Sequence, residues 1–395
     1  MARKTGEELE KIKSKHGVDK LYSWSRVNSY HTSPYEYFLR YVKNPLEPEP
    51  EDREDCIYGV AGNLVHDIME RFYSNEITYE EMTDEFEDAW LTASVAELKF
   101  DRNAEDKDKK ISAKYYECLK HFFKHHKIIE YKVDLERFIT VKIGNSVLQG
   151  YIDCCFRDDD GCITILDWKT STIYKGAKAL NECGQLVVYA VALHQLGVPY
   201  EKIKICWDFL KYVNVEITQA NGKKTERQIE RNQIGEKLQS NAKMWLKKCG
   251  YEEEIVEYLD LLVQTNSIEC LPKDVQAKYK QSDCIMYVDL TDELIDKWHN
   301  HVTEIIKEIE GKEEEYKKTE DDKLFWESDE QVAAQSYYFA TLCGYSANKH
   351  KPYKAYLERL DREKEEKENL YGGVGTDSGT DGDDKNEDMS WLNDL

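Results

Sequence analysis

Apolar and polar residues alternate along the middle of the chain, the pattern of strands with one buried face. The alternation predicts three strands, at about residues 136–143, 146–157 and 162–168. The short acidic turn RDDDG separates the last two, so we expect them to be antiparallel neighbours. A further strand is expected at KIKICWDFLKY, followed by a hairpin whose turn is Asn221-Gly222.

Helical patterns surround these strands. A mostly apolar helix is predicted over about residues 179–197, ending near Gly197. The segment GVAGNLVHDIMERFYSN also has helical spacing. Its Gly62, His66 and Glu70 share one side, apart from an apolar stripe. Helices are also predicted within residues 21–43, 78–131 and 231–369.

The order of elements predicts an α/β protein with a central mixed sheet flanked by helices. We expect an N-terminal helical segment and Pro-rich linker at 1–60, and a core at 61–230 with a helical insertion near 78–131. A helical region at 231–370 and a disordered acidic tail at 371–395 complete the predicted organisation.

The net charge of −23 argues against a protein that coats nucleic acid non-specifically, although it is compatible with a local basic groove. The chain has neither an apolar stretch long enough to span a bilayer nor an apolar signal segment at its charged N-terminus, so no membrane association is expected. Eleven cysteines without zinc-site spacing suit a reducing compartment. We therefore expect a cytoplasmic protein, in the host cytoplasm if the chain is phage-encoded.

Charged residues interrupt two of the predicted strands, where an unpaired charge would be costly. Asp153 lies within one strand, Asp167 ends the next, and Lys169 follows two residues later on the same face. Carboxylate oxygens suit Mg²⁺ or Mn²⁺, and a lysine beside them suits the charge of a phosphate transition state. His66 and Glu70 are expected to approach this group from the helix.

Four motifs, GNLVHDIMERF, GYID, LDWKT and QLVVY, resemble in order and spacing those of the PD-(D/E)XK nuclease superfamily. The resemblance covers about residues 21–212 and is strongest to the RecB-like branch, which includes phage and CRISPR-associated exonucleases. It implies a restriction-endonuclease-like core and a metal-dependent DNA nuclease acting in recombination, repair or replication. An exonuclease is the first expectation. The alternatives are a structure-specific endonuclease and a catalytically silent subunit that retains the fold to bind other proteins.

The resemblance also implies roles for individual residues. His66, Asp153, Asp167 and the backbone carbonyl of Trp168 would bind the metal, and Lys169 would be the catalytic lysine. Glu70 would support the site. Gln185 and Tyr189, one helical turn apart, would contact the DNA backbone or support the lysine; alternatively, they only pack.

Many relatives of this branch hold an iron–sulfur cluster through one N-terminal and three C-terminal cysteines. Here Ser33 stands at the N-terminal position, and only Cys343 remains of the C-terminal set. Cluster ligation commonly needs four thiolates. We therefore expect no iron–sulfur cluster, and aromatic packing in its place.

Two further features have alternative interpretations. His121, His125 and His126 lie in a Lys-rich helix, where a solvated or phosphate-facing surface is favoured over a metal site. The acidic tail ends in MSWLNDL. It is either a solubilising segment or a flexible leader whose Trp391, Leu392 and Leu395 dock on a replication or recombination protein.

Overall fold

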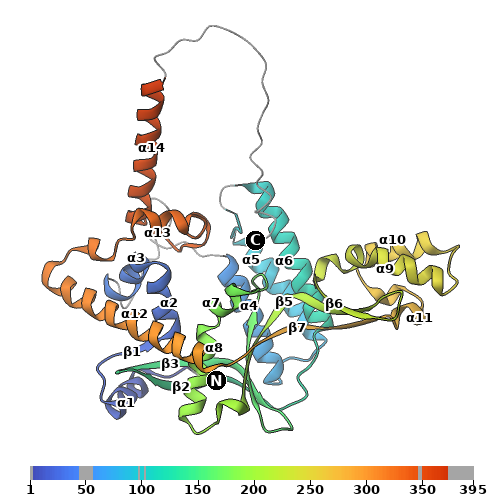
Figure 1. Ribbon diagram of the computed structural model, residues 1–395, viewed down its shortest axis with the longest axis horizontal. Coiled ribbons are helices and arrows are strands. Elements are labelled where there is room, and N and C mark those ends of the chain that lie inside the picture. Colours follow the sequence, from blue (N-terminus) through green and yellow to red (C-terminus); the bar gives the residue numbers. More distant parts are fainter. Residues whose placement is uncertain (1–2, 44–56, 97, 102–103, 346–348, 372–395) are drawn as a thin grey trace.

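The computed structural model describes residues 3–43, 57–96, 98–101, 104–345 and 349–371 (Figure 1). The expectations for the Pro-rich linker and for the acidic tail beyond Tyr371 concern residues outside these ranges. A seven-stranded mixed sheet forms the centre. Its strands are β1 Leu21–Ser23, β2 Val133–Ile143, β3 Ser146–Arg157, β4 Ile163–Lys169, β5 Ile203–Thr218, β6 Lys224–Glu230 and β7 Tyr279–Val288.

Helices cover the sheet and extend beyond it. The N-terminal half contains α1 Gly6–His16, α2 Trp24–Thr32, α3 Pro34–Tyr37, α4 Ile57–Tyr73, α5 Glu81–Val95 and α6 Glu105–His125. The remaining helices are α7 Ala177–Glu182, α8 Gly184–Gln195, α9 Ile234–Lys248, α10 Ile255–Thr265, α11 Lys273–Gln276, α12 Asp292–Thr319, α13 Asp329–Ala334 and α14 Lys351–Tyr371. The predicted α/β fold with a mixed sheet between helices is confirmed.

Two different strands share one edge of β3 and leave a gap between them. Strand β2 runs antiparallel along one edge of β3 from Ser146 to Phe156. The other edge of β3 is shared: β1 pairs with residues 147–149, and β4 pairs with residues 154–157. Between these two partners, no strand among the described residues pairs with residues 150–153 on that edge. The backbone there is open to side chains from the helices.

The two faces of the sheet are buried under different helices. One face packs against α8, α12 and the N-terminal helices, in a core that includes Ile165 and Trp207. The other packs against α4, α5 and α6, in a core that includes Leu166 and Trp168. A third, smaller core lies between α9, α10 and α11 and the outer parts of β5, β6 and β7, and includes Val215 and Ile229 (Figure 1).

Two elements differ from the sequence predictions. The region after residue 231 is mainly helical as predicted, but it also contributes β7, which pairs with β5. The helix predicted over residues 179–197 is divided into α7 and α8, which meet at Cys183. The first residue of α8 is Gly184, and only a glycine fits there, because a Cβ would lie 2.1 Å from the ring of Trp24. Strands β1 and β7 thus come from outside residues 61–230.

No helix in the described parts of the chain is both long and apolar enough to cross a bilayer.

Candidate metal-dependent nuclease site

The two predicted aspartates lie on one face of the sheet. Strands β3 and β4 are antiparallel, with Cys154 paired to Leu166 and Cys155 to Ile165. Side chains alternate along a strand, so Asp153 and Asp167 flank the first of these pairs on the same side. Burial raises the pKa of Asp153 well above its ordinary value, and the negative charge of Asp167 adds to this effect. The structure therefore brings together two carboxylates that repel each other unless a cation or a proton joins them.

Lys169 extends this group. Its Nζ lies 2.7 Å from Oδ2 of Asp167, two residues earlier on β4. Burial alone would lower the pKa of Lys169, but the charge of Asp167 and the hydrogen bond to it outweigh burial and raise the pKa. Lys169 is therefore a fixed positive charge at neutral pH and cannot accept a proton.

His66 reaches the same place from α4. Its Nε2 lies 2.9 Å from the backbone oxygen of Trp168, and its Nδ1 lies 3.8 Å from Oδ2 of Asp153. Burial lowers the pKa of His66, so the ring is neutral at physiological pH. A neutral ring that donates from Nε2 to the carbonyl leaves the lone pair of Nδ1 directed towards Asp153. This tautomer offers its lone pair on the side of the carboxylates, where a metal ion would be bound.

These groups line a cleft of about 870 Å³. Its ionisable lining is mainly acidic: two basic side chains, Arg3 and Lys169, face the five carboxylates Asp67, Glu70, Glu136, Asp153 and Asp167. Burial, and then the charge of Glu136, raise the pKa of Glu70. A cleft with this charge repels a phosphodiester unless cations are bound. The donor set of two aspartates, a neutral imidazole and a carbonyl fits Mg²⁺ or Mn²⁺.

Glu136 was not predicted as a site residue. It lies on β2 between Leu135, which pairs with Cys154, and Arg137, which pairs with Ile152. Its φ of 45° is in the left-handed region, where a residue other than glycine is strained. The charge of Glu136 contributes to raising the pKa values of both Asp153 and Glu70. Strand alternation alone carries no signal of this backbone kink.

Gln185 and Tyr189 occupy successive turns of α8. The Gln185 Nε2 donates to the hydroxyl of Tyr189 over 3.1 Å. Gln185 lines the cleft, whereas Tyr189 is buried against β3. A Cβ on Gly150 would come within 2.8 Å of the Tyr189 ring. The glycine of the GYID motif therefore allows this tyrosine to lie directly on the strand.

Comparison with known proteins gives one clear result. A search of curated proteins finds no match to the chain. The sequence model of the PD-(D/E)XK nuclease superfamily, in contrast, matches residues 22–347, which include all seven strands except the first residue of β1. The match spans most of the chain and contains all of the residues that line the cleft except Arg3. The chain belongs to the PD-(D/E)XK nuclease superfamily.

Proposed function

We propose that the protein is a metal-dependent DNA nuclease, and that it acts as an exonuclease of the RecB-like branch. The observation that carries this proposal is the convergence of Asp153, Asp167, Lys169 and His66 in one open cleft. His66, Asp153, Asp167 and the carbonyl of Trp168 would hold Mg²⁺ or Mn²⁺. When bound, such an ion supplies positive charge to the phosphate and makes a water molecule more acidic.

The chain's own residues would do the rest. Lys169 stays protonated, so it can donate hydrogen bonds to the phosphate oxygen that gains charge in the transition state. Asp167 holds the Lys169 ammonium in place. Gln185 would contact the DNA backbone from α8, and the buried Tyr189 would act through it as a positioning residue. Glu70 and Glu136 would strengthen cation binding along the cleft.

Nucleotide release from linear and circular double-stranded DNA, with Mg²⁺ or Mn²⁺, tests the proposal. An exonuclease releases acid-soluble nucleotides from linear DNA only, and a chelator stops the release. Asp153→Asn should abolish it, whereas Asp134→Asn, a half-exposed aspartate on β2, should not. Nicking of circular or branched DNA without nucleotide release would identify a structure-specific endonuclease. A folded, metal-supplied protein that cleaves none of these substrates would favour the silent binding subunit.

We also propose that the protein holds no iron–sulfur cluster. Ser33 Oγ lies 2.6 Å from Glu327 Oε1 and 3.2 Å from His350 Nε2, so a buried hydrogen-bonded group surrounds it. Cys343 Sγ lies 3.7 Å from a carboxylate oxygen of Glu36. Burial, and then the charge of Glu36, raise the pKa of the Cys343 thiol. A raised pKa disfavours the thiolate that a cluster needs. Iron analysis and the visible spectrum of the purified protein test this; stoichiometric iron would contradict it.

A further inference from the structure

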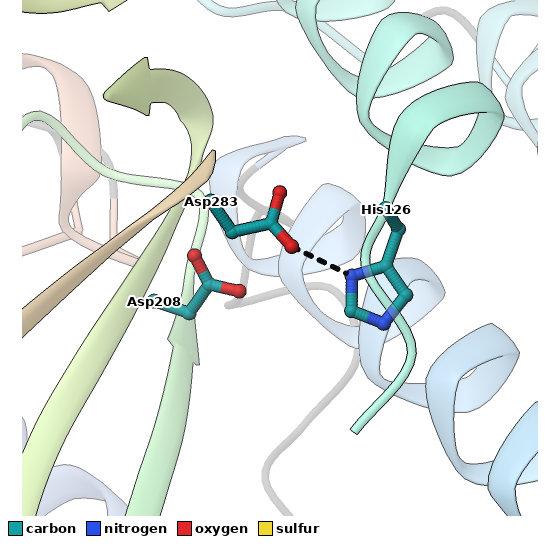
Figure 2. Close-up of side chains that lie close together, drawn as sticks. All are labelled: His126, Asp208 and Asp283. Carbon is teal, nitrogen blue, oxygen red and sulfur yellow. Dashed lines mark ion pairs between the residues drawn. The ribbon is translucent and has the colours of Figure 1, made fainter. Parts of the chain in front are cut away.

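A second group of metal-ligand side chains lies on the opposite face of the sheet from Asp167. His126 directly follows α6, Asp208 lies on β5 and Asp283 on β7 (Figure 2). One ligand atom from each lies within 4.8 Å of the other two, and all three residues are buried. His126 therefore does not face solvent or phosphate, as its Lys-rich helix had suggested. Its partners are 82 and 157 residues further along the chain, beyond the reach of a local pattern.

The strand register explains how the two aspartates meet. Asp167 pairs with Trp207 and Trp168 with Asp208, so Asp208 shares the face of Trp168 and points away from the cleft. On the other edge of β5, Asp208 pairs with Ile285, and Asp283 lies two residues earlier on the same face. The β5–β7 register shifts between Asp208 and Val213. Such irregularities re-aim side chains and are frequent beside functional sites.

The group contains a buried carboxylate oxygen without a hydrogen-bond partner in the described structure. Asp208 is 2% exposed, and its Oδ1 has no hydrogen-bond partner. His126 Nδ1 lies 3.3 Å from Asp283 Oδ2, within ion-pair distance but poorly aligned for a hydrogen bond. Figure 2 shows the Asp208 carboxylate directed towards the space between the other two side chains. A buried carboxylate without a partner is costly, so the space between these atoms calls for a cation or a proton.

The surroundings orient the three side chains. The Tyr73 hydroxyl lies 2.9 Å from His126 Nε2, which fixes the ring and leaves Nδ1 for the interior of the group. Asp283 accepts hydrogen bonds from Arg231 Nη2 at 2.6 Å and from the Lys127 backbone nitrogen at 2.9 Å. Arg231 balances the charge of Asp283. Among the described residues no basic side chain forms an ion pair with Asp208, so its carboxyl needs either a cation or a proton.

We propose that His126, Asp208 and Asp283 bind one first-row divalent ion, of the Zn²⁺ or Mn²⁺ type, separate from the nuclease centre. One imidazole and two carboxylates are a donor set of three protein ligands for such ions, with ligand distances of about 2.0–2.2 Å. A small inward movement of the three side chains would reach that geometry. The ion would link β5, β7 and the segment after α6, on the face of the sheet opposite the cleft.

The rival explanation is a metal-free group in which Asp208 is protonated. Burial, and then the charge of Asp283, raise the pKa of Asp208 well above its ordinary value, so a proton can occupy the site when an ion does not. The two explanations differ in what Asp208→Asn does. An amide mimics a protonated carboxyl and leaves a metal-free site undisturbed. It removes the charge that an ion requires.

The test uses the full chain with Asp153→Asn and Asp167→Asn as background, so that ions of the nuclease centre do not contribute and failure of the nuclease proposal does not affect the result. The protein is incubated with Zn²⁺ or Mn²⁺, passed through a desalting column and analysed for metal. The background protein should retain about one ion per chain, and a chelator should lower its thermal midpoint. Adding Asp208→Asn should abolish both effects. Adding Asp158→Asn, in the β3–β4 turn, should abolish neither.

Two outcomes would overturn the proposal. One is a background protein that retains no ion and is as stable as its Asp208→Asn derivative, which identifies the protonated group. The other is equal metal retention with and without Asp208→Asn, which places the ion elsewhere. If Asp208→Asn does not fold, Co²⁺ bound to the background protein decides. Nitrogen and oxygen ligands give weak visible bands without sulfur charge transfer, whereas strong sulfur bands would assign the ion to cysteines.

Discussion

The two faces of the central sheet carry the same kinds of side chain in opposite surroundings. On one face, Asp153 and Asp167 line an open cleft, together with Lys169, which forms an ion pair with Asp167. On the other, Asp208 and Asp283 are buried beside Arg231. Asp167 is itself only 6% exposed, but the carboxylates on this face line a cleft that a substrate can enter. In the interior, a cation bound by the same kinds of side chain would be out of reach of a substrate and could only stabilise the fold. Access, rather than residue type, separates a candidate catalytic centre from a candidate structural one.

The largest effect should come from Lys169→Ala. Lys169 is proposed to act on charge that develops in the transition state, so its loss should reduce turnover by about 10²–10³-fold. DNA binding, measured by fluorescence anisotropy, should change little, because ground-state contacts remain. Lys202→Ala is the matched control, since this exposed lysine lies at the opposite end of the β4–β5 ladder. Unchanged turnover in Lys169→Ala would remove the lysine from the mechanism.

Lys211 on β5 tests how the interior treats an unpaired charge. The side chain is 2% exposed and its Nζ lies 3.7 Å above the ring of Tyr115. Burial, and then the charge of Lys114, lower the pKa of Lys211 to about 7. Between that pH and about 10 the unfolded chain binds more protons than the folded protein, so the free energy of unfolding should rise with pH.

Lys211→Met should therefore be more stable than the parent at pH 7 and below by a few kcal/mol, since each unit of pKa shift corresponds to about 1.4 kcal/mol. The variant should also lose part of the rise in stability between about pH 7 and 10. Urea unfolding across this range measures both. Lys204→Met is the control, because this exposed lysine on β5 is paired with Asp158 and its loss should not stabilise the protein. A destabilised Lys211→Met would mean that the amine makes a favourable contact in the interior.

Gly150→Ala should damage the cleft through packing alone. The added Cβ would overlap the Tyr189 ring, which must move and take Gln185 with it. We expect a loss of about 1–3 kcal/mol in stability and a fall in nuclease activity at the same time. Gly311→Ala in α12 is the control, because a Cβ there meets nothing within 4 Å. That variant should gain up to about 1 kcal/mol from helix propensity. Full activity in Gly150→Ala would separate Tyr189 from catalysis.

Local patterns predicted the parts of the fold that depend on neighbours along the chain. Alternation and the acidic turn predicted β3, β4 and their antiparallel pairing, and therefore the shared face of Asp153 and Asp167. Helical spacing predicted that Gln185 and Tyr189 lie one turn apart, and they are hydrogen bonded. These features follow from periods of two and of about 3.6 residues, which a sequence carries directly.

The missed features depend on distant partners or on backbone strain. Strand β7 lies among charged helices in the sequence and has a half-exposed pattern, and only pairing with β5 identifies it as a strand. His126 is buried beside Asp208 and Asp283, which lie far from it in the sequence. Glu136 enters the cleft through a left-handed backbone that no residue type in its strand announces.

Substitutions of Glu136 should have the smallest effects. They discriminate well, because the charge and the backbone strain of this residue can be altered separately. Glu136→Gln removes only the charge. If the charge assists cation binding, the Mg²⁺ concentration for half-maximal activity should rise about tenfold while the rate at saturating Mg²⁺ stays close to that of the parent. Glu130→Gln, an exposed glutamate before β2, should leave both quantities unchanged.

Glu136→Gly removes the charge and also relieves the strain of a positive φ, which costs about 1–2 kcal/mol for a residue with a Cβ. This variant should show the same weakened Mg²⁺ dependence as Glu136→Gln but equal or greater stability in thermal unfolding. Equal Mg²⁺ dependence in the parent and in both variants would assign the kink to packing alone. A fall in the saturating rate without a change in Mg²⁺ dependence would instead place Glu136 at the reacting phosphate. The strain would in either case be held at the cleft by the pairing of Leu135 and Arg137 on both sides of it.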